Sequence, residues 1–238
     1  MPATITFQYQ SASGSTFAVS PSLVGDIEGL INQVRSEIAI QKAAGLFVGY
    51  LSVPISPRSG GDFQTNKAVA AHAAIRLRTE FGSRLWLLNP AAYNLPDAAT
   101  GSDYMAVWAA ILAGLDGTGG DFDLAYFLGP SDVWAFFGVG GTDRIGTIET
   151  WLAARAATEP AYKAIYDDPK KRTQFLRYYG LRGSTIFSKG GHDEWNIVVA
   201  LNGRRPIGED IAVYFDGKPV EPGDYSSPVD AGNALVLH

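Results

Sequence analysis

The hydrophobic positions in the first half of the chain follow two spacings, one typical of strands and one typical of helices. The run Leu46–Val53 is apolar on both faces, as in a buried central strand of a parallel sheet. Apolar residues three and four positions apart predict helices over 22–44 and 62–81. A second strand is predicted at 84–89. Strand, loop, helix and strand therefore follow one another as in a right-handed parallel crossover.

The second half carries more helices and one ambiguous apolar run. Helical spacing predicts helices over 102–115 and 148–157, and one or two more over 160–180, broken at Asp168-Pro169. Periodicity alone does not separate strand from helix over 121–138. We predict a strand at Val133–Phe137 within that run.

Residues that favour β-strands are concentrated near both ends of the chain. Alternating β-formers at 4–9 and 16–20 predict an N-terminal hairpin. From Thr185 onward, short β-like runs are separated by turn signals, including the pairs Asn202-Gly203 and Asp216-Gly217. These runs predict a small β-rich C-terminal part.

Together these elements predict an α/β fold with an open parallel, Rossmann or flavodoxin-like sheet flanked by helices. The α/β domain, with the N-terminal hairpin and helix, would extend over 1–183. A β-rich appendage would follow over 184–238.

Composition narrows the range of partners. The 238 residues carry a formal net charge of −5, which argues against a nucleic-acid polymer, because that partner requires clustered Lys and Arg. We expect a small-molecule ligand, no membrane span and a cytoplasmic location, since no long apolar run or signal-peptide pattern is seen. The absence of Cys excludes disulfides and thiolate chemistry. We expect no cofactor.

Several common catalytic motifs are absent. The glycine-rich stretch 138–147 lacks the Gly-Lys-Ser/Thr ending of a P-loop. Ser131 lacks the second glycine of a nucleophile elbow. The three histidines show no metal-ligand spacing, and His192-Asp193-Glu194 is better explained as a polar turn than as a metal site.

Polar side chains gather instead where the predicted parallel strands end. The three loops concerned are Ser52–Gly61, Asn89–Tyr93 and Gly138–Glu149. Ligands of open α/β sheets bind outside the carboxyl ends of the strands. We therefore expect the three loops to converge on one site.

The order of motifs over residues 46–155 resembles the nucleoside 2-deoxyribosyltransferase-like family. The first strand and its loop match as Tyr50-Leu51-Ser52-Val53-Pro54 and Ser56–Gly61. Asp123-Leu124, followed by Ser131–Gly138, is similar to the family's next motif. Asp143, Gly146, Thr147 and Glu149 are similar in kind to the residues that then open its catalytic helix.

The resemblance implies cleavage of an N-glycosidic bond through an oxocarbenium-like transition state. Glu149 would be the nucleophile, Asp143 would position the sugar or the base, Tyr50 would orient the nucleophile, and Asp103 would protonate the leaving base. Substrate-binding positions would be Ser52, Ser56, Arg58, Gly60, Gly61, Asn89, Gly146 and Thr147, with Arg58 and Ser56 on a phosphate.

The resulting hypothesis is an N-glycosidase or glycosyl transferase, such as a nucleoside deoxyribosyltransferase or nucleotide N-glycoside hydrolase. Two alternatives stay open. The Gly-Thr pair lies one residue nearer the Glu than in the family, and Trp151 replaces a small residue, as expected for a non-catalytic nucleotide-binding module. The third hypothesis is a structural or interaction protein. A homo-oligomer is compatible with each of the three.

Overall fold

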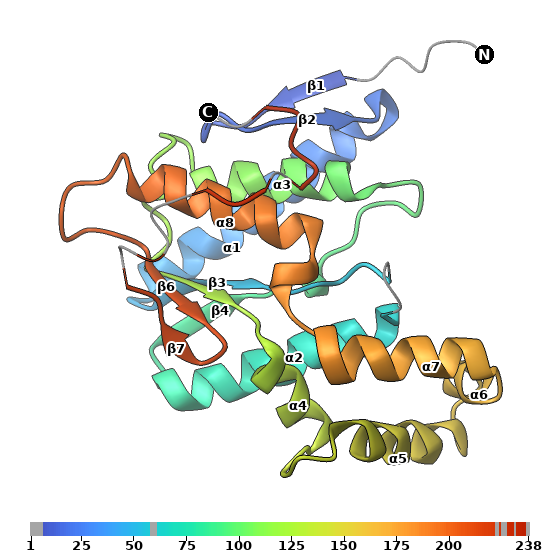
Figure 1. The fold of residues 1–238 in the computed structure, drawn as a ribbon. Coiled ribbons are helices and arrows are strands. Elements are labelled where there is room, and N and C mark those ends of the chain that lie inside the picture. Colours follow the sequence, from blue (N-terminus) through green and yellow to red (C-terminus); the bar gives the residue numbers. More distant parts are fainter. Residues whose placement is uncertain (1–6, 58–60, 222–223, 225–227, 231, 237–238) are drawn as a thin grey trace.

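The computed structural model describes residues 7–57, 61–221, 224, 228–230 and 232–236. It shows a mixed α/β fold in which helices flank a mostly parallel sheet on both faces (Figure 1). Residues 4–6 of the predicted hairpin lie outside the described part. Its remainder is confirmed as β1 (Phe7–Gln10) paired antiparallel with β2 (Thr16–Val19).

Within the described residues the central sheet has five strands in the order β4-β3-β5-β6-β7. The first four of these are parallel, and β7 runs antiparallel to β6. The predicted central strand is confirmed, since β3 pairs on both edges and its Tyr50 lies beside Leu88 and Ala125. The strands are β3 (Phe47–Ser52), β4 (Leu85–Leu88), β5 (Leu124–Phe127), β6 (Ala212–Phe215) and β7 (Lys218–Pro219).

One face of the sheet is covered by three helices, with the β1–β2 hairpin lying beyond them (Figure 1). The middle helix is buried on nearly every side, which explains its continuous apolar sequence from Met105 to Ala113. These helices are α1 (Val24–Ala43), preceded by the short turn η1 (Pro21–Leu23), α3 (Gly101–Ala113) and α8 (Lys189–Asn202).

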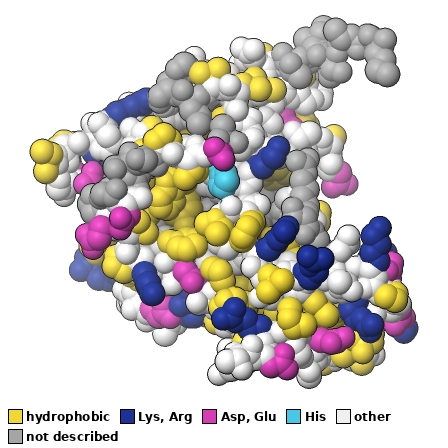
Figure 2. All heavy atoms as spheres, in the orientation of Figure 1, with side chains coloured by type: hydrophobic (Ala, Val, Ile, Leu, Met, Phe, Trp, Pro, Cys, Tyr) yellow, Lys and Arg dark blue, Asp and Glu magenta, His cyan; other side chains and the backbone are white. Residues whose placement is uncertain are grey.

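The opposite face carries the remaining helices (Figure 1). On the face shown in Figure 2, Lys and Arg side chains over the lower helices are mixed with Asp and Glu. Lys163 pairs with Asp167, and Arg155 with Glu159, one helical turn away, as in a solvated helix face. These helices are α2 (Phe63–Phe81), α4 (Pro130–Phe137), α5 (Arg144–Ala156), α6 (Pro160–Tyr166) and α7 (Pro169–Arg177). Aromatic side chains of β5, α4, α5, α6 and α7 are part of the hydrophobic core on this face.

Local capping sets where several helices begin and end. Asp62 caps α2 by accepting a hydrogen bond from the Thr65 backbone, and Gly82 ends that helix at φ 95°. Asp168 caps α7, which confirms the predicted break at Asp168-Pro169. Asp143 caps α5, and that helix therefore begins at Arg144, four residues before the predicted start.

The strand predicted at Val133–Phe137 is wrong, because these residues belong to α4. Pro130 occupies the first turn, and the Asp132 carboxylate accepts a hydrogen bond from the Gly129 N–H at 2.8 Å, which together start a helix. Val133 and Phe137, one helical turn apart, are both buried on the same side of this helix. The strand lies earlier in the same apolar run, as β5.

The predicted β-rich appendage over 184–238 is also wrong. The run 195–201 lies in α8, and Asn202-Gly203 ends that helix rather than turning a hairpin. The β6 strand pairs with β5, so residues after 184 complete the main sheet and its helical layer. Asp216-Gly217 is confirmed as a hairpin turn with both residues at positive φ.

Three short helices complete the described secondary structure. They are the 3-10 helices η3 (Pro90–Ala92) and η5 (Thr185–Phe187) and the π-helix η4 (Tyr178–Arg182). The η3 helix follows β4, whereas η4 and η5 lead from α7 into α8.

Candidate functional site

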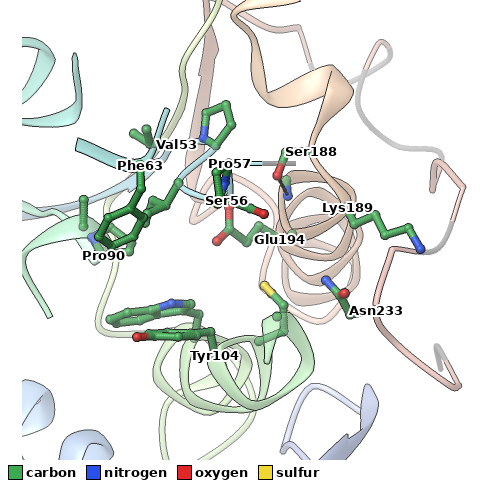
Figure 3. Close-up of a pocket in the computed structure, with 18 of the residues that line it drawn as sticks. Val53, Ser56, Pro57, Phe63, Pro90, Tyr104, Ser188, Lys189, Glu194 and Asn233 are labelled. Carbon is green, nitrogen blue, oxygen red and sulfur yellow. Dashed lines mark hydrogen bonds between the residues drawn. The ribbon is translucent and has the colours of Figure 1, made fainter. Parts of the chain in front are cut away.

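A cavity of about 610 Å³ opens at the carboxyl ends of β3 and β4, on the face covered by α3 and α8 (Figure 3). This volume is within the range of about 300–1,000 Å³ that small-molecule sites occupy. The β3 loop contributes 53–57, and the β4 loop contributes 90, 91, 93 and 94. The first two turns of α3 and α8 form much of the remaining lining, together with Phe63, Tyr178, Phe187 and Asn233.

Glu194, on the second turn of α8, is the acidic residue among the described residues that line the cavity. Its side chain is only 6% exposed. The Tyr50 hydroxyl donates a hydrogen bond to Oε1 at 2.6 Å, and the Ser52 hydroxyl donates to Oε2. The carboxylate is therefore fixed from the sheet side, with the cavity in front of it.

The β3 strand explains why Tyr50 and Ser52 act on the same carboxylate. Side chains two residues apart on a strand point to the same face, here the face that carries α8. Both side chains are fully buried, and Phe122 packs edge-on against the Tyr50 ring with centroids 5.9 Å apart. Ser188 caps α8 by accepting a hydrogen bond from the Gly191 N–H, which sets the start of the helix that carries Glu194.

Burial raises the pKa of Glu194 to about 7. The hydrogen bonds from Ser52 and Tyr50 act in the opposite direction by favouring the ionised form, and the neighbouring Asp193 raises the pKa further. Burial and the negative charge of Glu194 hold the pKa of Tyr50 well above its usual range. Tyr50 therefore remains a proton donor to Glu194 at neutral pH.

The cavity has an aromatic side and a polar side (Figure 3). Phe63, Pro90 and Tyr104 lie on one side of Glu194. Trp108 also lines the cavity and lies one turn after Tyr104 on α3. The Tyr104 hydroxyl accepts a hydrogen bond from the Leu95 N–H at 3.0 Å, which fixes its ring against the cavity. Across from them lie Ser188, Lys189 and Asn233.

Three of the sequence-predicted site residues lie at this site. Tyr50 and Ser52 hold Glu194, and Ser56 lines the cavity. Asn89 directly follows β4 and precedes the lining residue Pro90, but its Oδ1 caps η3 by accepting the Ala91 N–H at 3.0 Å. Two of the three loops expected to converge therefore meet.

The third loop does not take part in the cavity. Glu149 lies on α5, has a side chain 43% exposed, and is 3.8 Å from the Arg172 guanidinium. Asp143 caps the same helix by accepting the Gly146 N–H at 2.9 Å, and the Thr147 hydroxyl donates to the Asp143 carbonyl. Residues 133–137 form a helix instead of a strand of the sheet. Residues 138–149, which follow them, therefore do not lie at the carboxyl edge of the sheet.

Asp103 serves as a helix cap in this structure. Its carboxylate is buried and accepts hydrogen bonds from the Ser20 N–H at 2.8 Å and from the N–H and hydroxyl of Thr100 at 2.8 and 2.6 Å. Arg58 and Gly60 lie outside the described residues. Gly61 packs against Tyr178, where an added Cβ would lie 2.9 Å from the ring.

Sequence reasoning missed Glu194 because the surrounding residues were interpreted as a turn and a strand. The signal that could have found it is the helical spacing of Trp195, Val198 and Leu201, which follows two acidic residues. A helix over these residues would have placed Glu194 within the buried part of the chain.

Two further properties hold for the described part of the chain. It contains no group of three His, Asp or Glu side chains placed to hold a metal ion. It also lacks a helix with the length and apolar content needed to span a bilayer. Comparisons of the chain with protein-family models, with curated proteins and with solved structures found no match.

Proposed function

We propose that the chain is an N-glycosidase or glycosyl transferase for a nucleoside or nucleotide, with Glu194 as its catalytic carboxylate. The observation that carries this proposal is the buried Glu194 at the floor of an aromatic-walled cavity, held by Tyr50 and Ser52. In this proposal Tyr50 orients Glu194, whereas the sequence resemblance implied that it would orient Glu149.

The architecture supports the same proposal. The strand order β4-β3-β5-β6 with parallel pairing is compatible with a Rossmann or flavodoxin-like sheet. Ligands of such sheets bind outside the carboxyl ends of the strands, which is where the cavity lies. The cavity walls also suit an N-glycoside, because a planar base stacks well on aromatic side chains.

The chemistry follows from the position of the carboxylate. As the bond between C1′ and the base nitrogen breaks, its electron pair leaves with the base and positive charge develops on the sugar. The ionised Glu194 stabilises that charge, more strongly in a buried site than in water, or bonds to C1′ as a nucleophile. Water then attacks C1′ and also supplies the proton that the base takes. An acceptor base in place of water would give transfer.

The direct test is to incubate the protein with a panel of nucleosides and nucleoside 5′-monophosphates and to measure free base by chromatography. Wild type should release base from at least one substrate. Glu194→Gln keeps the shape of the side chain but removes the charge, and we expect its rate to fall at least 100-fold.

Glu149→Gln is the matched control, because it changes a carboxylate of the same type on half-exposed α5. We expect it to keep the wild-type rate within about twofold. Equal loss in both variants, or no base released from any substrate by wild type, would overturn the proposal. Nucleotide binding without turnover would favour the non-catalytic module.

A further inference from the structure

The described residues of the C-terminal segment, 229–230 and 232–236, lie along the helical layer and meet the N-terminal hairpin (Figure 1). The segment is tied at its two ends. Asn196 of α8 exchanges two hydrogen bonds with the Val229 backbone, at 3.0 and 2.7 Å. The Thr16 N–H donates to the Val236 carbonyl at 2.9 Å, and the Leu235 N–H donates to the Thr16 carbonyl at 2.7 Å.

Between these ends, Asp193 clamps the middle of the segment. Its side chain is fully buried, and its Oδ1 accepts the N–H groups of Gly232 and Ala234 at 3.0 and 3.1 Å. Its Oδ2 accepts the backbone N–H of Asn233 at 2.6 Å and the Asn233 Nδ2 at 3.0 Å. These four hydrogen bonds satisfy a carboxylate whose burial would otherwise be costly. They also fix the middle of the segment, in addition to the contacts that hold its two ends.

Among the described residues of this segment, Asn233 lines the cavity. Figure 3 shows the Asn233 amide directed toward the cavity, on the side of Glu194 opposite Phe63 and Pro90. The described hydrogen bonds use one N–H of this amide and leave the second N–H and the carbonyl oxygen for the cavity. Gly101 leaves room for the amide, because an added Cβ there would lie 3.3 Å from Oδ1.

We infer that Asn233 contacts the sugar of the N-glycoside and that Asp193 is its positioning residue. This inference rests on the proposed function. With the base stacked on the aromatic side and C1′ at Glu194, the rest of the sugar extends toward Asn233. An amide offers both a donor and an acceptor, which matches a sugar hydroxyl.

Asn233→Ala tests the contact, because it removes the amide while the backbone N–H groups remain available to Asp193. On the best substrate of the panel we expect KM to rise about tenfold, with kcat changed less than threefold. The Kd measured on a Glu194→Gln background should rise by the same factor. The effect should shrink for one of the 2′-, 3′- and 5′-deoxy analogues, the one that lacks the contacted hydroxyl.

Asp193→Asn tests the positioning role, and Asp230→Asn is its control, since Asp230 is an exposed carboxylate in the same segment. We expect Asp193→Asn to raise KM and lower Tm, and Asp230→Asn to change neither. A merely structural role for Asp193 would lower Tm and leave KM unchanged.

The outcomes separate the two proposals. If wild type releases base and Asn233→Ala keeps KM within twofold, or if all three deoxy analogues show the same penalty, the contact with a sugar hydroxyl is overturned while the proposed function stands. If wild type releases no base from any substrate, the proposed function fails and the inference fails with it.

Discussion

At the scale of single residues, Glu149 and Glu194 show how environment decides what a glutamate can do. Glu149 is half-exposed beside the Arg172 guanidinium, where water and a cation stabilise its charge. Glu194 is buried and receives hydrogen bonds from Tyr50 and Ser52. Burial raises the pKa of Glu194, and the two hydroxyls fix its orientation toward the cavity, a combination that supports the catalytic role proposed for it.

The raised pKa predicts a stability that falls as pH rises. Glu194 titrates near 4.5 in the unfolded chain and near 7 in the folded protein. Between these values the folded state binds the extra proton, so the free energy of unfolding decreases as pH rises and levels off above 7. A difference of this size corresponds to about 3 kcal/mol.

Urea unfolding of wild type and Glu194→Gln between pH 5 and 8 measures this effect. The stability of wild type relative to Glu194→Gln should decrease by up to about 3 kcal/mol as pH rises across the range. Glu149→Gln controls for the loss of one negative charge. A difference between wild type and Glu194→Gln that stays constant with pH would contradict the assigned pKa.

At the scale of elements, the spacing of hydrophobic residues and the capping residues were enough to predict much of the fold. The apolar run before Pro54 predicted β3, and Asp168-Pro169 predicted the break between α6 and α7. The wrong predictions fell where the local sequence favours helix and strand equally. The run 121–138 is apolar throughout, and its division into β5 and α4 depends on Pro130 and the Asp132 cap.

The candidate site was harder to predict because it depends on contacts between distant parts of the chain. The strand-end rule pointed to the loop that begins at Ser52, and the family resemblance pointed to Tyr50. Their partner Glu194 is 144 and 142 residues away, and it reaches them only because α8 packs on the sheet. Strand-like Ile197-Val198-Val199 concealed that helix, since β-branched residues favour strands until tertiary packing overrides them.

The β6–β7 turn provides an element-scale prediction. The Asp216 carboxylate accepts hydrogen bonds from the Ser131 N–H at 2.7 Å and the Ser131 hydroxyl at 3.0 Å, which ties the hairpin to the start of α4. Asp216 also has φ 51°, a conformation that Asn tolerates and Ala does not. Asp216→Ala should therefore lower the free energy of unfolding by about 2 kcal/mol, and Asp216→Asn by less than about 1 kcal/mol.

Urea unfolding at pH 7 distinguishes these two variants. If neither variant lost stability, neither the hydrogen bonds nor the backbone conformation of Asp216 would matter to the hairpin. A loss in Asp216→Asn as large as the predicted Ala value would assign the effect to the charge.

At the scale of the whole molecule, the cavity joins parts of the chain that fold around different cores. Its walls come from the β3 and β4 loops, from α3 and α8, and from the C-terminal segment, whereas Phe63 begins α2 on the opposite face of the sheet. A ligand that fills the cavity contacts all of these parts in the folded state and none of them in the unfolded chain. Binding should therefore stabilise the entire domain.

Thermal unfolding of the Glu194→Gln variant measures this coupling without turnover. A substrate nucleoside or nucleotide at about 100 times its Kd should add about 2.7 kcal/mol, which raises Tm by about 5–10 °C in a domain of this size. Phe63→Ala in the same background removes a 39% exposed ring at a helix position that accepts Ala, so the fold is preserved.

The loss of base stacking should weaken binding about tenfold and reduce the shift in Tm for ligands that carry a base. Ribose 5-phosphate, which has no base to stack, should give the same smaller shift in both variants. If Phe63→Ala reduced the Tm shift of the base-carrying ligand and that of ribose 5-phosphate equally, the aromatic side of the cavity would not be the base site. The ligand orientation that places the sugar at Asn233 would then have to be reversed.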